Sequence, residues 1–316
     1  MKEVTKQSFI RGSKWFLVLL SIALTAVACS PATFAPPGTI VDDLGRAANI
    51  ERIPQRIISL VPSNTEILFA LGLGEKVVGV TEYCNYPPEA LSKEKVGGFS
   101  TPDIERIIAL QPDLILAGRI HEKNIIPSLE ERNLTVFALV PKNLAGILKD
   151  IEMLGKITGK DKEASKLVTQ MKNRIKAITD KTKDLQERPR VFYVTFHDPL
   201  YSVGSETIIH ELIEKAGGVN IFQDITGHKT VDLETVIARN PEIIIACTGH
   251  GDAEGKPLKW AKEEPMLRVT EARKNNRIYQ IDADLVTRPG PRIVDALEEF
   301  ARFIHPGVFS ESKGGD

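Results

Sequence analysis

Apolar residues recur at steps of three and four positions between Lys160 and Arg188, a stretch without glycine or proline. This spacing predicts a helix whose apolar side chains share one face. They are Ala164, Leu167, Val168, Met171, Ile175 and Ile178. Such a narrow apolar stripe suits a helix that lies across two domains, although a surface helix of a single domain would show the same pattern. At 1.5 Å per residue this helix would be roughly 40 Å long.

Short apolar runs alternate with helical patterns on the N-terminal side of this helix. Strands are predicted at residues 56–61, 77–80, 114–117 and 135–140. Helices are predicted at residues 67–71, from Pro102 to just before Pro112, and at 125–132. This alternation favours a parallel sheet covered on both faces, so residues 40–142 are expected to form a three-layer α/β lobe.

The same pattern returns after the long helix. A strand is predicted at residues 190–196 and a helix at 206–216. Residues 232–246 then repeat residues 103–117, an offset of 129 positions (232 − 103), with matching acids, a proline and a four-residue apolar strand. Asp103 and Asp232 are predicted to cap their helices, and Glu105 and Glu234 then lie in the first turns, where they complement the helix dipole.

The repeat indicates two lobes, residues 40–142 and 190–309, on either side of a connecting helical segment at 143–189. Residues 310–316 would form a short tail. With a lobe on each side, the long helix is expected to be the bridge. A cleft between two lobes is the default binding site.

Composition excludes some classes of function. The 316 residues carry a formal net charge of -1, so the chain lacks the basic character of a nucleic-acid-binding protein. The 3 cysteines have the spacing of neither a disulfide framework nor a zinc site. We expect a monomer with no cofactor of its own.

The N-terminal 29 residues are predicted to be an export signal. A basic start precedes an apolar run from Trp15 to Ala28, which is too short to span a membrane. The run ends in Ala-Val-Ala-Cys, which resembles a bacterial lipobox with Cys29 as the lipidated residue; ordinary signal-peptidase cleavage is the alternative. The proline-rich linker at 30–39 would tether the protein to the outer face of the membrane. Without the lipid, the protein would be periplasmic.

Aromatic residues lie on the loops where an α/β sheet places its ligands. Tyr83 and Tyr86 follow a predicted strand, and Phe99 follows two glycines. Together they could form an apolar wall for a large ligand, or they could pack against their own lobe. Candidates from the second lobe are Phe196, His197, Tyr201, His228 and the segment 284–292.

The chain from about residue 40 to residue 309 resembles the substrate-binding lipoproteins of ABC importers for cobalamin, haem and iron–siderophores. The matching stretches are residues 58–66, 86–88, 105–117 and 288–292. The resemblance implies two Rossmann-like lobes with central, mostly parallel sheets, bridged by one long helix, with only small closure on ligand binding. It also implies a non-enzymatic protein whose partner is a permease dimer.

Within that family, the chain is most similar to the cobalamin-binding branch. The resemblance implies that Tyr83, Phe99, Asp284, Arg288 and an aromatic of the second lobe (Phe196 or Tyr201) hold the corrinoid. Tyr86 is a further candidate. The chain departs from the branch at Gly118 and His228, where large aromatic residues would be expected. His228 could ligate cobalt or haem iron, or it could be a surface histidine. His121, beside a helix, is expected to have no special role.

The resemblance implies a second role for Glu105 and Glu234. In the family, each lobe carries one glutamate, and the two glutamates dock onto the two permease subunits. Equivalent positions in a sequence repeat suit that two-fold arrangement. Stabilisation of the helix dipole is the alternative.

Two other hypotheses remain open at this point. The same receptor could take haem or a ferric siderophore. An exported hydrolase would use Ser63, His197 and Asp198. However, the chain has no Gly-x-Ser-x-Gly elbow, no His-Glu-x-x-His motif and no phosphate loop, and its Gly-Gly pair at 97–98 lacks the spacing of a nucleotide-binding fingerprint.

Overall fold

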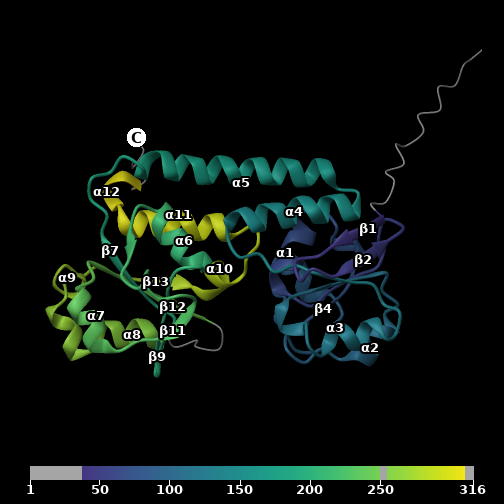
Figure 1. Cartoon of the computed structure of the whole chain (residues 1–316), viewed down its shortest axis with the longest axis horizontal. Helices are drawn as coiled ribbons and strands as arrows, with labels where there is room; N and C mark the ends of the chain where they lie inside the picture. Colours follow the sequence, from purple (N-terminus) through teal and green to yellow (C-terminus); the bar gives the residue numbers. More distant parts are fainter. Residues whose placement is uncertain (1–37, 250–254, 310–316) are drawn as a thin grey trace, which may run out of the picture. The chain divides into compact units, whose positions relative to one another are not determined.

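The computed structural model describes residues 38–249 and 255–309. The described residues belong to one compact unit. This unit contains two α/β lobes and the helices that join them (Figure 1). The predicted signal segment with Cys29, the linker up to residue 37 and the tail at 310–316 lie outside the described residues.

The N-terminal lobe is built on a parallel sheet with the strand order β4-β3-β5-β6. Its strands are β3 (Ile57–Ser59), β4 (Val77–Val80), β5 (Leu114–Ala117) and β6 (Val136–Ala138). Each strand falls within a predicted one, because each is a short and mostly apolar run. The helices are α1 (Pro62–Ala70), α2 (Ile104–Ala109) and α3 (Ile125–Glu130), with single 3-10 turns η1 (Gly74–Lys76), η2 (Pro88–Ser92) and η3 (Arg119–His121).

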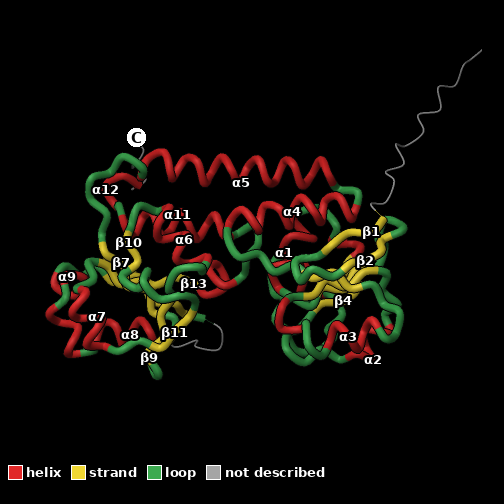
Figure 2. Tube along the Cα trace, in the orientation of Figure 1, coloured by secondary structure: helices red, strands yellow, loops and turns green. Residues whose placement is uncertain are grey.

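The C-terminal lobe repeats this topology. Its parallel sheet has the order β10-β7-β12-β13, so in both lobes the first strand lies between the second and the third. The strands are β7 (Arg190–Val194), β10 (Val219–Asn220), β12 (Ile243–Thr248) and β13 (Ile278–Asp282). Figure 2 shows each group of strands with helices beside it. In this order, ligands bind outside the carboxyl ends of the first and third strands.

Helices flank the second sheet as they flank the first. They are α6 (Ile208–Lys215), α7 (Leu233–Arg239), α8 (Lys256–Glu263), η4 (Pro265–Val269), α9 (Glu271–Lys274), α10 (Ala283–Thr287), α11 (Ile293–Ile304) and α12 (Pro306–Phe309). The two predicted caps are confirmed. Asp103 accepts a hydrogen bond from the backbone N–H of Arg106 at 3.1 Å, and Asp232 accepts one from Thr235 at 2.7 Å.

Two small antiparallel sheets were not predicted. One is the hairpin of β1 (Gly38–Val41) and β2 (Ala47–Ile50). The other joins β8 (Phe196–His197), β9 (Leu200–Val203) and β11 (His228–Thr230) in the order β11-β9-β8. These strands have two to four residues, and β11 is exposed throughout, so no apolar alternation marks them in the sequence.

The bridging helix is α5 (Asp161–Thr182), which packs against α4 (Leu144–Thr158) and against α11 (Figure 1). Four members of its predicted apolar stripe are buried, namely Ala164, Val168, Met171 and Ile178. The helix ends at Thr182, earlier than the predicted Arg188. Thr182 is buried and its hydroxyl donates to the carbonyl of Lys215 at 3.0 Å, which fixes the helix end against α6.

One hydrophobic core runs through both lobes. It contains Leu116 of the first sheet, Met171 of α5 and Ile245 of the second sheet. The opposite faces of the sheets have separate cores, with Ile107 of α2 in one and Val236 of α7 in the other. The lobes are therefore joined by shared apolar packing on the α4–α5 side.

Helices α4 and α5 approach closely at Gly155. A Cβ added there would lie 2.4 Å from the Cβ of Ala164. We expect Gly155→Ala to push the helices apart and to lower the free energy of unfolding by about 1–3 kcal/mol, measured by chemical denaturation. Gly307→Ala is the matched control, because its added Cβ meets nothing within 4 Å. Equal stability of both variants would contradict this interpretation.

Candidate functional site

Most of the predicted aromatic residues are exposed rather than packed into their own lobes. The exposed fractions are 58% for Tyr83, 42% for Tyr86, 45% for Phe196 and 37% for Tyr201. These rings therefore keep much of their surface free for contact with a ligand. Packing against the lobe surface, the alternative reading of these loops, is therefore disfavoured.

The second-lobe candidates lie on the small antiparallel sheet. Phe196 of β8 is directly opposite Tyr201 of β9, so their side chains are cross-strand neighbours. His228 is on β11, opposite Val203, and is exposed. Among residues 38–249 and 255–309, no group of three or more His, Cys, Asp or Glu side chains could hold a metal ion.

Phe99 is half-buried because it packs edge-on against His121, with ring centroids 5.7 Å apart. His121, expected to have no special role, is fully buried. Its Nδ1 accepts from the backbone N–H of Gly118 at 3.0 Å, so its Nε2–H donates to the carbonyl of Phe99 at 2.7 Å. His121 thus ties the Phe99 loop to the loop after β5. That loop also carries the exposed Ile120, a candidate that sequence reasoning missed.

Burial lowers the pKa of the His121 imidazole. The unfolded chain, in which histidine has a pKa of about 6.5, binds this proton more readily than the folded protein does. Stability contributed by neutral His121 is therefore present above that pH and is lost as the pH falls below it.

As the pH falls from 7 to 5, we expect the free energy of unfolding of the wild type to decrease more than that of the His121→Asn variant. The extra decrease should be at most about 1.4 kcal/mol per pH unit. Asparagine keeps an acceptor near the position of Nδ1 but does not titrate. Denaturant unfolding at several pH values measures the difference between the two proteins. A difference that does not change with pH would contradict this role of His121.

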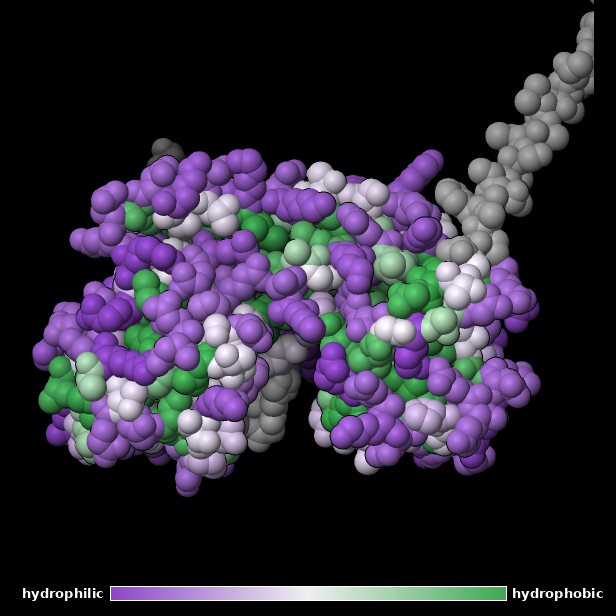
Figure 3. Space-filling model, viewed as in Figure 1, coloured by the Kyte–Doolittle hydropathy of each residue, from purple (hydrophilic) through white to green (hydrophobic). Residues whose placement is uncertain are grey.

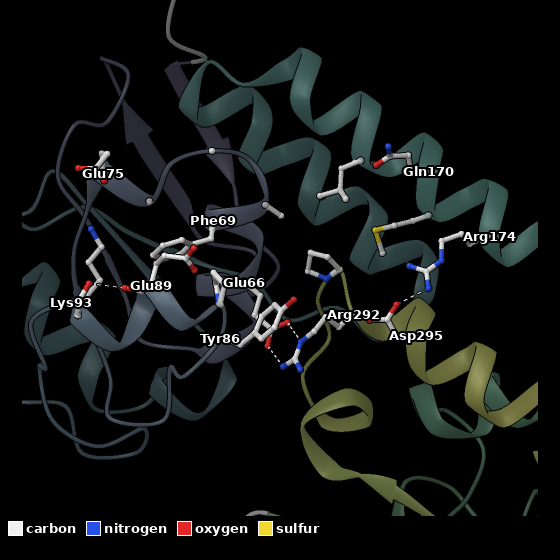
Figure 4. A pocket seen from close by; sticks show the side chains of 18 of the residues that line it. Glu66, Phe69, Glu75, Tyr86, Glu89, Lys93, Gln170, Arg174, Arg292 and Asp295 are labelled. Atoms are coloured by element: carbon white, nitrogen blue, oxygen red, sulfur yellow. Dashed lines mark hydrogen bonds and ion pairs between the residues drawn. The ribbon is translucent and has the colours of Figure 1, made fainter.

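The two lobes meet through a network of charged and polar side chains, here named the lobe junction, in which Glu66 and Arg288 are buried. From the N-terminal lobe it contains Glu66, Asn85 and Tyr86, and from the C-terminal lobe Asp284, Arg288 and Arg292. Figure 4 shows three of its members, Glu66, Tyr86 and Arg292, close together. Arg292 donates to both carboxylate oxygens of Glu66, at 2.9 and 2.5 Å, and its guanidinium lies 4.0 Å from the ring centroid of Tyr86.

Arg288 was predicted to hold the ligand, and the structure places it in this junction. It is buried, and it pairs with Asp284 at 2.6 Å, donates to Asn85 Oδ1 at 2.5 Å and lies 3.7 Å from Glu66. Its Nε is buried and has no hydrogen-bond partner within the part of the chain that is described. Asp284 is half-buried beside it.

Burial raises the pKa of Glu66, and the two arginines oppose this shift. Glu66, Asn85 and Arg292 were not assigned any role from the sequence. Glu66 and Arg292 belong to stretches that carry the family resemblance, but only their pairing across 226 positions reveals what they do.

A cavity of about 1110 Å³ lies beneath α5, beside the lobe junction (Figure 4). Its lining includes Phe69, Lys93, Met171 and Arg174. Of the predicted ligand-binding residues, Tyr86 alone belongs to this lining. Of the remaining candidates, two lie on loops of the N-terminal lobe, three on the small antiparallel sheet and two in or directly after α10, namely Tyr83, Phe99, Phe196, Tyr201, His228, Asp284 and Arg288. Figure 3 shows a notch in the surface between the two lobes.

Glu105 and Glu234 occupy equivalent places in the two lobes. Each lies in the first turn of its helix, α2 or α7, and each is exposed. Neither makes an ion pair with the residues that the structure describes. The residues of the hydrolase hypothesis are less well placed, because Ser63 is buried within α1 whereas His197 lies on β8 of the other lobe.

Residues 57–285 match the family described as periplasmic binding protein. The chain is also 35% identical to the uncharacterized ABC transporter substrate-binding lipoprotein YvrC of Bacillus subtilis, over 95% of this chain and 99% of that protein. The chain belongs to this family. It is a substrate-binding protein of an ABC transporter, and members of its family bind substrates without converting them.

Other relatives have more specific descriptions. The chain is 30% identical to the vitamin B12-binding protein of Vibrio cholerae, over 91% of this chain and 98% of that protein. Among solved structures, a possible iron-binding protein of Staphylococcus epidermidis has a TM-score of 0.72 at 31% identity and covers 80% of this chain and all of its own. The haem-binding protein RhuT of Roseiflexus has a TM-score of 0.72 at 26% identity over 80% of this chain and 99% of its own.

These comparisons agree with the fold of two Rossmann-like lobes and a bridging helix. Relatives of the chain are lipoproteins and periplasmic proteins that act outside the cytoplasm. In the two described ranges, no helix has the length and apolarity needed to cross a membrane.

Proposed function

We propose that the protein captures a corrinoid, with cobalamin as the leading candidate, between its two lobes and delivers it to the permease of an ABC importer. The observation that carries this proposal is the similarity to vitamin B12-binding proteins over nearly the whole chain. The archaeal cobalamin-binding protein of Halobacterium salinarum, 26% identical over 93% of this chain, adds to it.

The aromatic residues support a broad, partly apolar ligand. Tyr83 comes from the loop after β4, and Phe196 and Tyr201 come from the small sheet of the other lobe. A corrin ring has two wide faces, and exposed aromatic rings from both lobes suit such faces. Phe99 is held in place by His121 and would add a fourth ring.

The charges of the lobe junction support a ligand edged with neutral amides. Two carboxylates, Glu66 and Asp284, are matched by Arg288 and Arg292, so these four groups leave no unpaired cation. A haem propionate would need an unpaired cation. An amide carbonyl needs only a donor, such as the Nε of Arg288, which has no hydrogen-bond partner among the residues that the structure describes.

Haem or an iron–siderophore is the second candidate. It is favoured by the similarity to the haem-binding and possible iron-binding structures, and by His228 on the exposed strand β11, which could ligate a metal. The retained visible spectrum of the purified protein would distinguish haem from a corrinoid.

We expect isothermal titration to give a micromolar or lower Kd for cyanocobalamin, and at least tenfold weaker binding of haem and of a ferric siderophore. Arg288→Ala should weaken corrinoid binding, because it removes a donor and the ion pair with Asp284. Arg268→Ala, in η4 of the same lobe, is the control and should bind as the wild type does. No corrinoid binding up to high micromolar concentration would contradict the proposed ligand.

We further propose that Cys29 carries a lipid and that residues 30–39 tether the lobes to the outer face of the membrane. The lipoprotein relative supports this anchor. The permease would then meet a receptor that is already confined to the membrane surface.

Glu105 and Glu234 are proposed to dock onto the two permease subunits. Replacing both by alanine should leave corrinoid affinity unchanged and abolish importer-dependent uptake, because exposed first-turn carboxylates contribute less than about 1 kcal/mol each to stability. Radiolabelled uptake in cells measures the effect. Replacing Glu122 and Glu263, which are exposed on the same two lobes, is the control. Unaltered uptake by the Glu105→Ala, Glu234→Ala double variant would contradict docking through these residues.

A further inference from the structure

The segment from Arg288 to Arg292 contacts the N-terminal lobe at several points. Asn85 accepts from Arg288, the Tyr86 ring faces Arg292, and Glu66 lies between the two arginines. Gly290 approaches the N-terminal lobe as well, since a Cβ there would lie 3.4 Å from the carbonyl oxygen of Ser63.

The two arginines differ in how firmly they are held. Arg292 makes a bidentate pair with Glu66 and stacks on Tyr86, which fixes both the plane and the direction of its guanidinium. Arg288 makes single-point contacts to Asn85 and Asp284 and has a buried Nε without a partner in the described chain. Arg292 therefore suits a fixed clamp, and Arg288 suits contact with a ligand.

Glu66 is the only acidic group within 4 Å of both arginines in the described ranges, and its side chain is 1% exposed. A buried guanidinium that loses its carboxylate is left with an uncompensated charge. Arg292 would then have to move toward Asp284 or toward water, whereas Arg288 would keep its pair with Asp284, and the lobes would lose their charged connection.

We propose that Glu66 is a positioning residue that clamps Arg292 across the lobe junction and thereby holds Asp284 and Arg288 in place for the ligand. This inference rests on the proposed binding role of Asp284 and Arg288. Because the Glu66–Arg292 pair fixes the spacing of the lobes before the ligand arrives, less conformational entropy is lost when the ligand binds.

The test combines lobe distances with affinity. Spin labels at Lys123→Cys and Lys262→Cys, both exposed and on different lobes, report the distance distribution by pulsed electron paramagnetic resonance. The native Cys84 and Cys247 are buried, which limits their labelling. Glu66→Gln removes the charge and keeps the shape, and Arg292→Lys keeps the charge and removes the bidentate geometry.

We expect one narrow distribution for the wild type, a broader one for both variants, and at least tenfold weaker cyanocobalamin binding by both. Asp224→Asn is the control, because it removes a bidentate pair with Arg239 inside one lobe and should change neither readout. Unchanged distances in a folded Glu66→Gln or Arg292→Lys protein would overturn the clamp. Broadened distances with wild-type affinity would overturn the positioning role.

The two proposals can fail separately. If the wild type binds no corrinoid, the proposed ligand fails, and the distance distributions of the ligand-free proteins still decide whether Glu66 clamps the lobes.

Discussion

The buried carboxylate of Glu66 constrains both lobes, because a charge taken out of water must keep its partner. Removing one member of such a pair typically costs about 3–5 kcal/mol. Glu66 belongs to α1 of the first lobe, and Arg292 directly precedes α11 of the second. Helix α11 in turn packs against α5. The ion pair therefore connects the first lobe, through α11, to the bridging helix α5.

The bridge itself resists bending. Helix α5 is continuous over 22 residues, and bending it would break its ladder of hydrogen bonds. Its buried side chains belong to the one core that includes residues of both sheets. A spacer of this kind would keep the aromatic residues of the two lobes, and Glu105 and Glu234, at nearly constant separations. This agrees with the small closure that the family resemblance implies.

Much of the fold was predictable because its signals are local. The strands of the N-terminal lobe are short apolar runs, and the offset of 129 residues correctly indicated a second lobe with matching helix caps. The end of α5 was placed too late, since the contact of Thr182 with Lys215 is not visible in the sequence. The sheet of β8, β9 and β11 was missed because its strands are very short and partly polar.

The candidate site was less predictable for a physical reason. Exposed aromatic loops can be found from the glycines and prolines around them, as Tyr83 and Tyr86 were. Glu66, Asn85 and Arg292 are polar residues within ordinary helical or loop patterns, and their importance lies in pairs that are more than 200 positions apart. His121 was likewise set aside, although its two hydrogen bonds hold the Phe99 loop.

The central claim is that a corrinoid binds between the lobes while the lobe junction stays closed. A crystal structure of the protein with bound cyanocobalamin tests it most directly. The account predicts a corrin ring in contact with Tyr83 or Phe99 from one lobe and with Phe196 or Tyr201 from the other, with the Glu66–Arg292 pair intact. A corrinoid bound in the cavity beneath α5, or a junction opened by the ligand, would contradict it.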